Sequence, residues 1–165
     1  MKKIILALLL LAPMTVFAQK FGCVDYDAIA QNLPEYAKAQ GDLQAMAKQF
    51  ENDLKAMQDE LRRKAEEYDK TKSTMNATKQ QETEQGLMEM QQKIQQAYED
   101  NSNELQKKQQ ELLQPIQLKV AKAIENVGTQ GGYVYIVMKG SLPFISPTLC
   151  EDVTEACKSE VLKVK

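Results

Sequence analysis

The sequence predicts an α+β protein that is mostly α-helical, with a long antiparallel helical hairpin attached to a small body of β-strands. Three observations predict this fold class. Residues 34–114 are rich in Gln, Lys, Glu and Met, two heptad-spaced apolar series run through them, and the flanking segments regain aromatic and β-branched residues. We therefore divide the chain into a leader at 1–18, body segments at 19–33 and 115–165, and a hairpin arm at 34–114.

The first 18 residues have the pattern of a signal peptide. Lys2 and Lys3 form a basic start, residues 4–12 are an unbroken apolar run, and a small-residue motif ends at Ala18. A membrane anchor is the alternative, but nine apolar residues span less than half of a hydrocarbon core of roughly 30 Å. The sequence therefore predicts cleavage after Ala18 and export to an oxidising compartment.

The composition excludes several kinds of active site. The 165 residues include no His and no Trp, so His-dependent nucleophilic catalysis and His-ligated zinc are excluded. Adjacent carboxylates such as Glu66 and Glu67 lie on a solvated helix, and no Gly-rich phosphate loop is present. Removing the leader leaves 19 basic against 23 acidic side chains, which is not the charge of a nucleic-acid binder. We expect no enzymatic activity, no cofactor, no metal site and no nucleic-acid partner.

The first body segment is expected to begin with a strand. Residues 21–26, FGCVDY, have β-propensity, and a short helical segment follows at 27–31. Pro34 suits the first turn of a helix because its fixed backbone angle fits there and its missing N–H would have no helical partner. We expect the arm to begin at Pro34.

Two series of apolar residues predict two long helices in the arm. The first series is Tyr36, Leu43, Ala47, Phe50, Leu54, Met57, Leu61 and Tyr68, and the second is Leu87, Ile94, Tyr98, Leu105 and Leu112. Residues 70–80 between them are poor in large apolar side chains, so we place the hairpin tip there. A reversal near Ala77 brings Phe50 against Leu105 and Leu43 against Leu112. Each of these facing pairs joins two apolar residues, so the sequence favours an intramolecular hairpin over a parallel coiled-coil dimer.

Three features mark the start and the interruptions of the second helix. Thr78 and Gln81 form a capping box that could begin it. Gly86 costs a helix interior about 1 kcal/mol relative to Ala, so we expect a hinge in the outer part of the arm. Pro115 should kink or end the helix, so we expect a second hinge at this residue and place the root of the arm there.

The second body segment predicts a helix, two strands and a terminal helix. An apolar helical face continues over 116–127 and stops at the glycine-rich residues 128–132. Residues 133–138, YVYIVM, form the strongest strand of the chain and, being apolar on both faces, are expected to be buried. A weaker edge strand is expected at 142–145 and a final helix at 155–162.

The body is too small to be stable alone. Its 66 residues carry three strands with unpaired edges, and such a sheet is marginal unless further strands complete it. Several copies that pair edge to edge would close a barrel and remove the edges. The residues expected in this oligomeric body are Phe21, Val24, Tyr133, Val134, Tyr135, Ile136 and Val137.

The three cysteines leave two interpretations open. In an exported protein, Cys150 and Cys157 could form one disulfide and leave Cys23 as a free thiol. Alternatively, all three are small buried apolar side chains. No Cys-x-x-Cys motif is present, so thioredoxin-like redox chemistry is not expected.

The arm tip carries a local positive charge. Lys70, Lys72 and Lys79 are the only charged residues from 70 to 81, whereas six acids and one lysine follow up to position 104. The tip is either a solvated charged surface or a site that steers acidic partners or membrane head groups. Met75 and Met88 are flexible apolar side chains suited to varied partners, although methionine also fills helix seams.

In their order and spacing, these features resemble the Skp/OmpH-like family of periplasmic chaperones, also called the seventeen-kilodalton protein family. The segments that carry the resemblance are FGCVDY at 21–26, LPEY at 33–36, the Gln-rich hairpin, LLQPI at 112–116, GYVYIV at 132–137 and DVT at 152–154. The resemblance implies a periplasmic homotrimer with a β-barrel body and three helical tentacles. The tentacles would enclose a cavity that holds unfolded outer-membrane proteins. Weak contact with membrane head groups is expected only if the basic tip has the second of the two roles given above.

The sequence therefore supports one function and one alternative. The first is an ATP-independent holdase, since no nucleotide-binding motif is present and many weak contacts from flexible arms can hold a client by avidity. The alternative is a structural coiled-coil spacer or a secretion adaptor in the cell envelope. The well-known members of the family are strongly basic, and the acidic mature chain departs from them in this respect.

Overall fold

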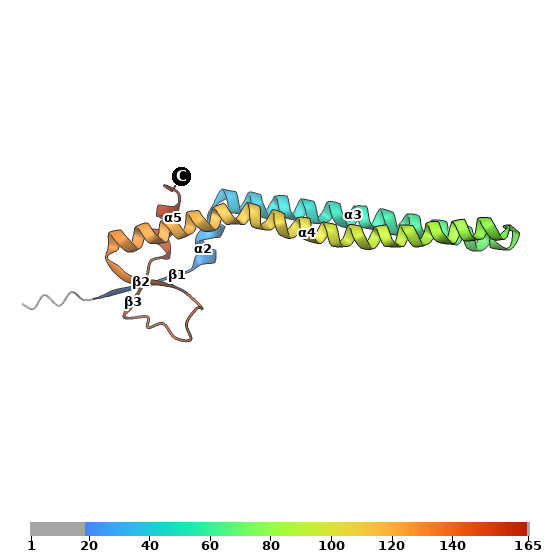
Figure 1. The fold of residues 1–165 in the computed structure, drawn as a ribbon. Helices are drawn as coiled ribbons and strands as arrows, with labels where there is room; N and C mark the ends of the chain where they lie inside the picture. The colour runs from blue at the N-terminus through green and yellow to red at the C-terminus, as the bar shows by residue number, and fades with distance from the viewer. Residues whose placement is uncertain (1–18, 165) are drawn as a thin grey trace, which may run out of the picture.

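The computed structural model describes residues 19–164 and has a slender two-helix arm that projects from a small body of strands and helices (Figure 1). The predicted leader at 1–18 lies outside the described residues. The elements in chain order are β1 (Lys20–Val24), α2 (Tyr26–Gln31), α3 (Pro34–Thr71), the 3₁₀ turn η2 (Lys72–Thr74), α4 (Ala77–Gly131), β2 (Tyr133–Met138), β3 (Cys150–Asp152) and α5 (Thr154–Val161). This order confirms the mostly helical fold class.

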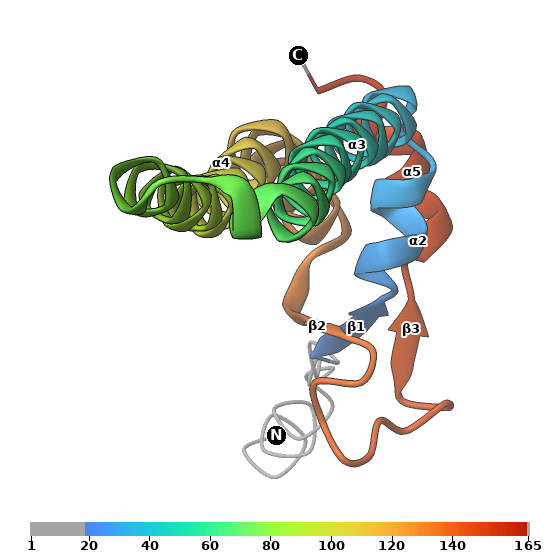
Figure 2. The ribbon, with the colours of Figure 1, turned by 90° about the vertical axis from the view of Figure 1, so that its right-hand side faces the viewer.

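Helices α3 and α4 form the predicted antiparallel hairpin, in which they lie side by side along the arm (Figures 1 and 2). Pro34 occupies the first turn of α3, as expected. At the root of the arm, Lys119 Nζ lies 2.9 Å from Glu35 Oε1, and near the tip the Tyr68 hydroxyl donates to Glu84. Both contacts agree with the register that a reversal near Ala77 predicts.

The chain reverses between η2 and α4 with a cap that the sequence pattern misplaced. The expected capping box of Thr78 and Gln81 is wrong, because Asn76 is the N-cap and its Oδ1 accepts from the Lys79 backbone N–H at 2.8 Å. Gln80 Nε2 also donates to two turn carbonyls, those of Lys72 and Met75. The side chains of the turn thus satisfy the backbone groups that a helix end leaves unpaired.

The buried seam of the arm is thin and differs from the predicted series at two positions. Tyr68 and Ala39 are buried, whereas most other seam residues are half-buried. Tyr98 is 62% exposed and Ala97 takes the inward position, while Ala47 is exposed and Met46 is half-buried instead. Seven residues do not make a whole number of turns at 3.6 residues per turn. The residue next to a predicted seam position can therefore face the partner helix in its place.

Helix α4 runs through Pro115 without ending. It continues to Gly131 and stops at Gly132, whose φ of +66° is the left-handed conformation common just after a helix. The residues after the proline, Ile116 and Val120, are buried in the body, and this packing offsets the backbone hydrogen bond that proline removes. The arm and the body therefore share one helix.

The body contains a three-stranded parallel sheet with the order β2-β1-β3. Phe21 lies opposite Tyr135 of β2 and opposite Cys150 of β3. The strand expected at 142–145 is wrong, because these residues belong to the loop between β2 and β3. Pro143 and Pro147 lack the N–H that a strand ladder needs, and the strand forms after them.

Helices α2, α4 and α5 bury one face of this sheet (Figure 2). The largest fully buried side chains are Val24, Ile29, Leu33, Val120, Cys157 and Val161. The Asp25 side chain caps α2 by accepting from Ala28 N at 2.9 Å, and the Asp25 backbone N–H donates to Thr154 Oγ1 at 3.0 Å. This pair of hydrogen bonds joins β1 and α2 to the start of α5.

The other face of the sheet is open, contrary to the expectation that strand 133–138 is buried. In β2, Val134, Tyr135 and Met138 are exposed. The body has one layer of helices, and that layer covers only the side of the sheet that holds Val24. A single chain therefore leaves apolar side chains of its strongest strand in contact with solvent.

Candidate functional site

The lysines at the arm tip are partly neutralised by acids of α4. Lys72 Nζ lies 3.3 Å from Glu84 Oε1 and 5.2 Å from the centre of the Tyr68 ring, and Lys79 Nζ lies 3.3 Å from Glu82. Hydrogen bonds from Tyr68 and then Lys72 lower the pKa of Glu84, and the Glu84 carboxylate raises the pKa of Tyr68. Lys72 thus helps to hold the two helices together at the tip.

A groove between the two helices lies just below the tip and has a volume of about 460 Å³. It brings together Met75, Lys79 and Gly86 of the predicted site and hinge residues. Its other walls include Tyr68, Thr71, Leu87 and Met90. Met88, the remaining predicted methionine, does not line the groove and is 58% exposed. The walls combine apolar side chains with the charged side chains of Lys64, Glu67 and Lys79, which suits a segment of unfolded chain with mixed side chains.

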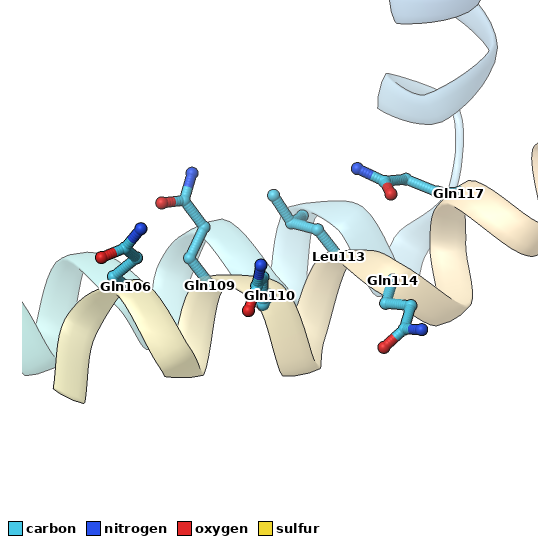
Figure 3. Close-up of a pocket in the computed structure, with 6 residues that line it drawn as sticks. All are labelled: Gln106, Gln109, Gln110, Leu113, Gln114 and Gln117. Atoms are coloured by element: carbon cyan, nitrogen blue, oxygen red, sulfur yellow. The ribbon is translucent and has the colours of Figure 1, made fainter. Parts of the chain in front are cut away.

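A second groove lies on α4 at the root of the arm and is lined by glutamines (Figure 3). Its volume is about 590 Å³, and the lining residues are Gln106, Gln109, Gln110, Leu113, Gln114 and Gln117. None of these side chains is charged, and each amide can both donate and accept hydrogen bonds. The surface can therefore bind peptide backbone without selecting for charge.

The glutamine groove was not among the predicted sites, although the sequence contains a signal for it. The residues at 106, 110, 113 and 117 recur with the 3,4 spacing of one helix face. Glutamine is common throughout the arm, so its spacing on one helix face does not stand out from the composition. Pro115, the predicted hinge, lines a neighbouring groove of about 280 Å³ between Ala39 and Lys119.

The open face of the sheet forms a third surface, lined mainly by apolar residues. The rings of Phe21 and Tyr135 are stacked with their centres 6.3 Å apart. Together with the loop after β2 they line a groove of about 290 Å³, which also includes Val137, Leu142, Phe144, Ile145, Leu149 and Cys150. Phe144 and Leu149 are 75% and 77% exposed, so this surface resembles an uncovered interface more than an ordinary solvent-facing sheet.

The predicted body residues fall on both faces of the sheet. Val24 is fully buried in the core, and Tyr133 and Ile136 pack partly against it. Val134 and Tyr135 are exposed, and Phe21 is 38% exposed on the open side. The Tyr133 hydroxyl donates to Glu151 Oε2 at 2.6 Å, and this bond, with some burial, raises the pKa of Tyr133 to about 12.

The cysteines are free thiols in the structure. Cys157 lies in the core on α5, whereas Cys150 is half-buried and lines the groove on the open face. The bridge between these two residues stays a prediction. Within residues 19–164, no cluster of acidic or cysteine side chains is arranged to hold a metal ion, and none of the helices has an apolar stretch of membrane-spanning length.

Comparison with known proteins assigns the chain to a family. Residues 20–161 match the family model described as outer membrane protein (OmpH-like). The chain belongs to the OmpH-like family. This match covers both body segments and the whole arm, and it confirms the resemblance seen in the sequence.

Two relatives agree with this assignment of the OmpH-like chain. It is 27% identical over 168 residues to the chaperone protein Skp of Yersinia enterocolitica, with 96% of this chain and 93% of the relative covered. It also resembles the crystal structure of a candidate outer membrane chaperone (OmpH-like) from Caulobacter crescentus, with a TM-score of 0.73 and 13% identity. That comparison covers 87% of this chain and 83% of the other and shows the shared fold. Both relatives are described as chaperones.

Proposed function

We propose that the mature chain is an ATP-independent holdase of the periplasm that binds unfolded outer-membrane β-barrel proteins and prevents their aggregation. The observation that carries the proposal is the pairing of a thinly packed arm with an apolar sheet face that a single chain leaves uncovered. An arm with a narrow seam can bend around varied clients. An uncovered sheet face provides a surface on which several such arms can be assembled.

The proposed assembly is a homotrimer whose sheets close on one another. Strands β2 and β3 are the two edges of the sheet, so each has a free row of backbone donors and acceptors. Pairing between copies would satisfy these edges and cover Tyr135, Phe144 and Leu149. Three copies would set three arms around a common space, as the family resemblance implies.

The proposed client contacts lie along the arm. The groove below the tip offers Met75 and Met90 with Lys79, and the glutamine groove at the root offers uncharged amides. An unfolded β-barrel strand alternates apolar and polar residues and exposes unpaired backbone groups. The groove below the tip suits its side chains, and the amides of the glutamine groove suit its backbone groups. Each contact is weak, but several contacts from three arms give high avidity with rapid local exchange.

The decisive experiment follows aggregation of a client. An outer-membrane β-barrel protein is diluted from urea into buffer, and light scattering is recorded with and without the mature chain at one trimer per client. We expect scattering to be suppressed without added nucleotide. Unchanged aggregation at this ratio would contradict the holdase function. An unrelated coiled-coil protein of similar charge serves as the control for non-specific crowding.

The alternative function is a structural spacer or secretion adaptor, which the long arm alone would suit. A spacer requires a fixed arm geometry and has no need of affinity for unfolded membrane proteins. The half-buried seam and the Gly86 position in open space favour a bending arm over a rigid rod. Binding of the denatured client, measured by fluorescence anisotropy, separates the two functions because only the holdase requires it.

A further inference from the structure

Two of the three cysteines lie on neighbouring strands of the body. In the parallel pair of β1 and β3, Phe21 lies opposite Cys150 and Cys23 lies opposite Asp152. Side chains two residues apart in a strand share a face, so Cys23, Phe21 and Cys150 lie on the same side of the sheet. Phe21 and Cys150 both line the groove on the open face, which identifies that side.

The backbone holds these two cysteines in fixed register. The Val153 N–H donates to the Cys23 carbonyl at 2.9 Å, and the Cys150 N–H donates to the Ser146 carbonyl at 3.1 Å. Beyond Cys23, Lys139 Nζ lies 2.6 Å from Asp152 Oδ2 and links the end of β2 to β3. Strand β3 therefore cannot slide along β1 without breaking several contacts.

The surroundings of the thiols separate Cys157 from the other two. Cys23 is only 7% exposed, and burial followed by the adjacent Cys150 side chain raises its pKa. Cys157 is fully buried in the core with Val120 and Val161, where burial and the charges of nearby acids raise its pKa. The Cys150 thiol therefore meets Cys23 on the open side of the sheet, while Cys157 lies among the helices on the other side.

We propose that Cys23 and Cys150 form a disulfide that joins β1 to β3 once the chain has been exported. This pairing replaces the bridge between Cys150 and Cys157 that their closeness in sequence suggested. The two side chains share one face of adjacent strands and are offset by two residues in the register. Closing the bond therefore needs a small local movement that brings the two Cα atoms within the range of a disulfide. The proposal depends on an oxidising compartment and is independent of client binding.

The reaction is thiol–disulfide exchange with a disulfide oxidant such as glutathione disulfide. The Cys150 thiolate attacks one sulfur of the oxidant, which forms a mixed disulfide and releases one thiol. The Cys23 thiolate then attacks the Cys150 sulfur and releases the second thiol. Two protein thiols are oxidised, one oxidant disulfide is reduced, and both protons end on the released thiols. Cys150 reacts first because it is half-buried and reachable, whereas Cys23 is enclosed.

The test is a peptide map of the mature chain refolded in a mixture of reduced and oxidised glutathione. Trypsin places Cys23 in the peptide 21–38 and places Cys150 and Cys157 together in the peptide 140–158. After alkylation of free thiols, we expect these two peptides to be linked and to separate on reduction. A bridge within peptide 140–158, or alkylation of all three thiols, would overturn the proposal.

Two variants identify the partner of Cys23. With Cys157→Ala the link between peptides should persist, and with Cys150→Ala it should be lost and Cys23 should be alkylated. A link that survives Cys150→Ala and disappears with Cys157→Ala would overturn the proposal, because it would assign the bond to Cys157. If a variant fails to fold, fragmentation of the linked peptides from the unmodified chain still shows whether Cys23 is joined to Cys150 or to Cys157. A bond to Cys157 would overturn the proposal.

Discussion

Asp152, the last residue of β3, is contacted by residues from two other parts of the body. One carboxylate oxygen lies 2.6 Å from Lys139 Nζ, and the other accepts from Thr154 Oγ1 at 2.6 Å and from its backbone N–H at 3.0 Å. Lys139 first, and Thr154 second, lower the pKa of Asp152 to about 2. The ionised carboxylate therefore ties β3 to the end of β2 and to the start of α5.

This contact gives the body a defined pH dependence. Because the folded pKa of Asp152 lies below the unfolded value of about 3.9, its contribution to stability is complete above that value. The contribution is lost as the pH falls through the folded pKa. We expect Asp152→Asn to lower the urea midpoint at pH 6, and the gap to the unmodified chain to narrow from pH 5 to pH 2.

Urea unfolding followed by circular dichroism at several pH values measures this gap. Asp69→Asn, which alters an exposed aspartate of α3, is the matched control and should leave the midpoint close to that of the unmodified chain at each pH. A midpoint difference for Asp152→Asn that stays constant across the range would show that the carboxylate charge does not contribute.

Asn76 is a second residue whose role can be tested directly. Its side chain caps α4 at the hairpin tip, whereas Thr78, which a capping-box pattern selects, lies inside the helix. We expect Asn76→Ala to destabilise the arm by about 1 kcal/mol, as loss of an N-cap does. Thr78→Ala should have a much smaller effect. Thermal unfolding compares the two variants, and equal losses would contradict the assigned cap.

At the scale of elements, Gly86 lowers the stability of the outer part of helix α4. A Cβ added at Gly86 would meet no atom within 4 Å, so alanine fits without displacing a neighbour. We expect Gly86→Ala to stabilise the arm by roughly 0.5–1 kcal/mol and to slow amide hydrogen exchange in its outer part. A stiffer arm should also suppress client aggregation less well if bending is needed for binding.

Gly41→Ala is the matched control for this hinge. Gly41 also lies in open space on a helix of the arm, but it is near the root. Its replacement should stabilise α3 by a similar amount and leave exchange in the outer arm unchanged. Slower exchange of the outer arm in both variants would show that general arm stability, and not a local hinge, controls the motion.

The elements that the sequence predicts well are those with strong periodic patterns. The long helices follow from two apolar series, and strand 133–138 follows from six β-prone residues. The continuation of α4 through Pro115 could not be predicted in this way, because it depends on the packing of Ile116 and Val120 against residues distant in sequence. The three-residue strand at Cys150–Asp152 is too short to show alternation, and its place is set by pairing with β1.

The candidate site was only partly predictable for the same reason. Met75, Lys79 and Gly86 meet in one groove because the hairpin register was correct. The pairing of Lys72 with Glu84 was missed, since local counting of charge does not show which acid of the facing helix is near. Contacts between helices and strands arise only when the chain folds, and so does the exposure of a face that no other element covers. A short stretch of sequence therefore does not reveal them.

At the scale of the whole molecule, the proposed assembly depends on the open sheet face. Tyr135 is 66% exposed beside Phe21, and the loop residues Phe144 and Leu149 extend the same apolar groove. If sister copies cover this face, a charge placed at its centre must lose its water on assembly, which costs several kcal/mol for an unpaired carboxylate. We expect Tyr135→Asp to remain folded but to be monomeric at micromolar concentrations, where we expect the unmodified mature chain to be a trimer.

Multi-angle light scattering measures the mass of both proteins, and circular dichroism checks that the variant keeps its helices. Tyr98→Asp is the matched control, because Tyr98 is 62% exposed but lies on the arm, far from the sheet. This variant should stay trimeric. Because holding a client by avidity needs several arms, the monomeric Tyr135→Asp should also lose most of its suppression of aggregation. A monomeric variant that still suppresses aggregation fully would mean that one arm is enough to hold a client, and a trimeric Tyr135→Asp would place the assembly contact elsewhere.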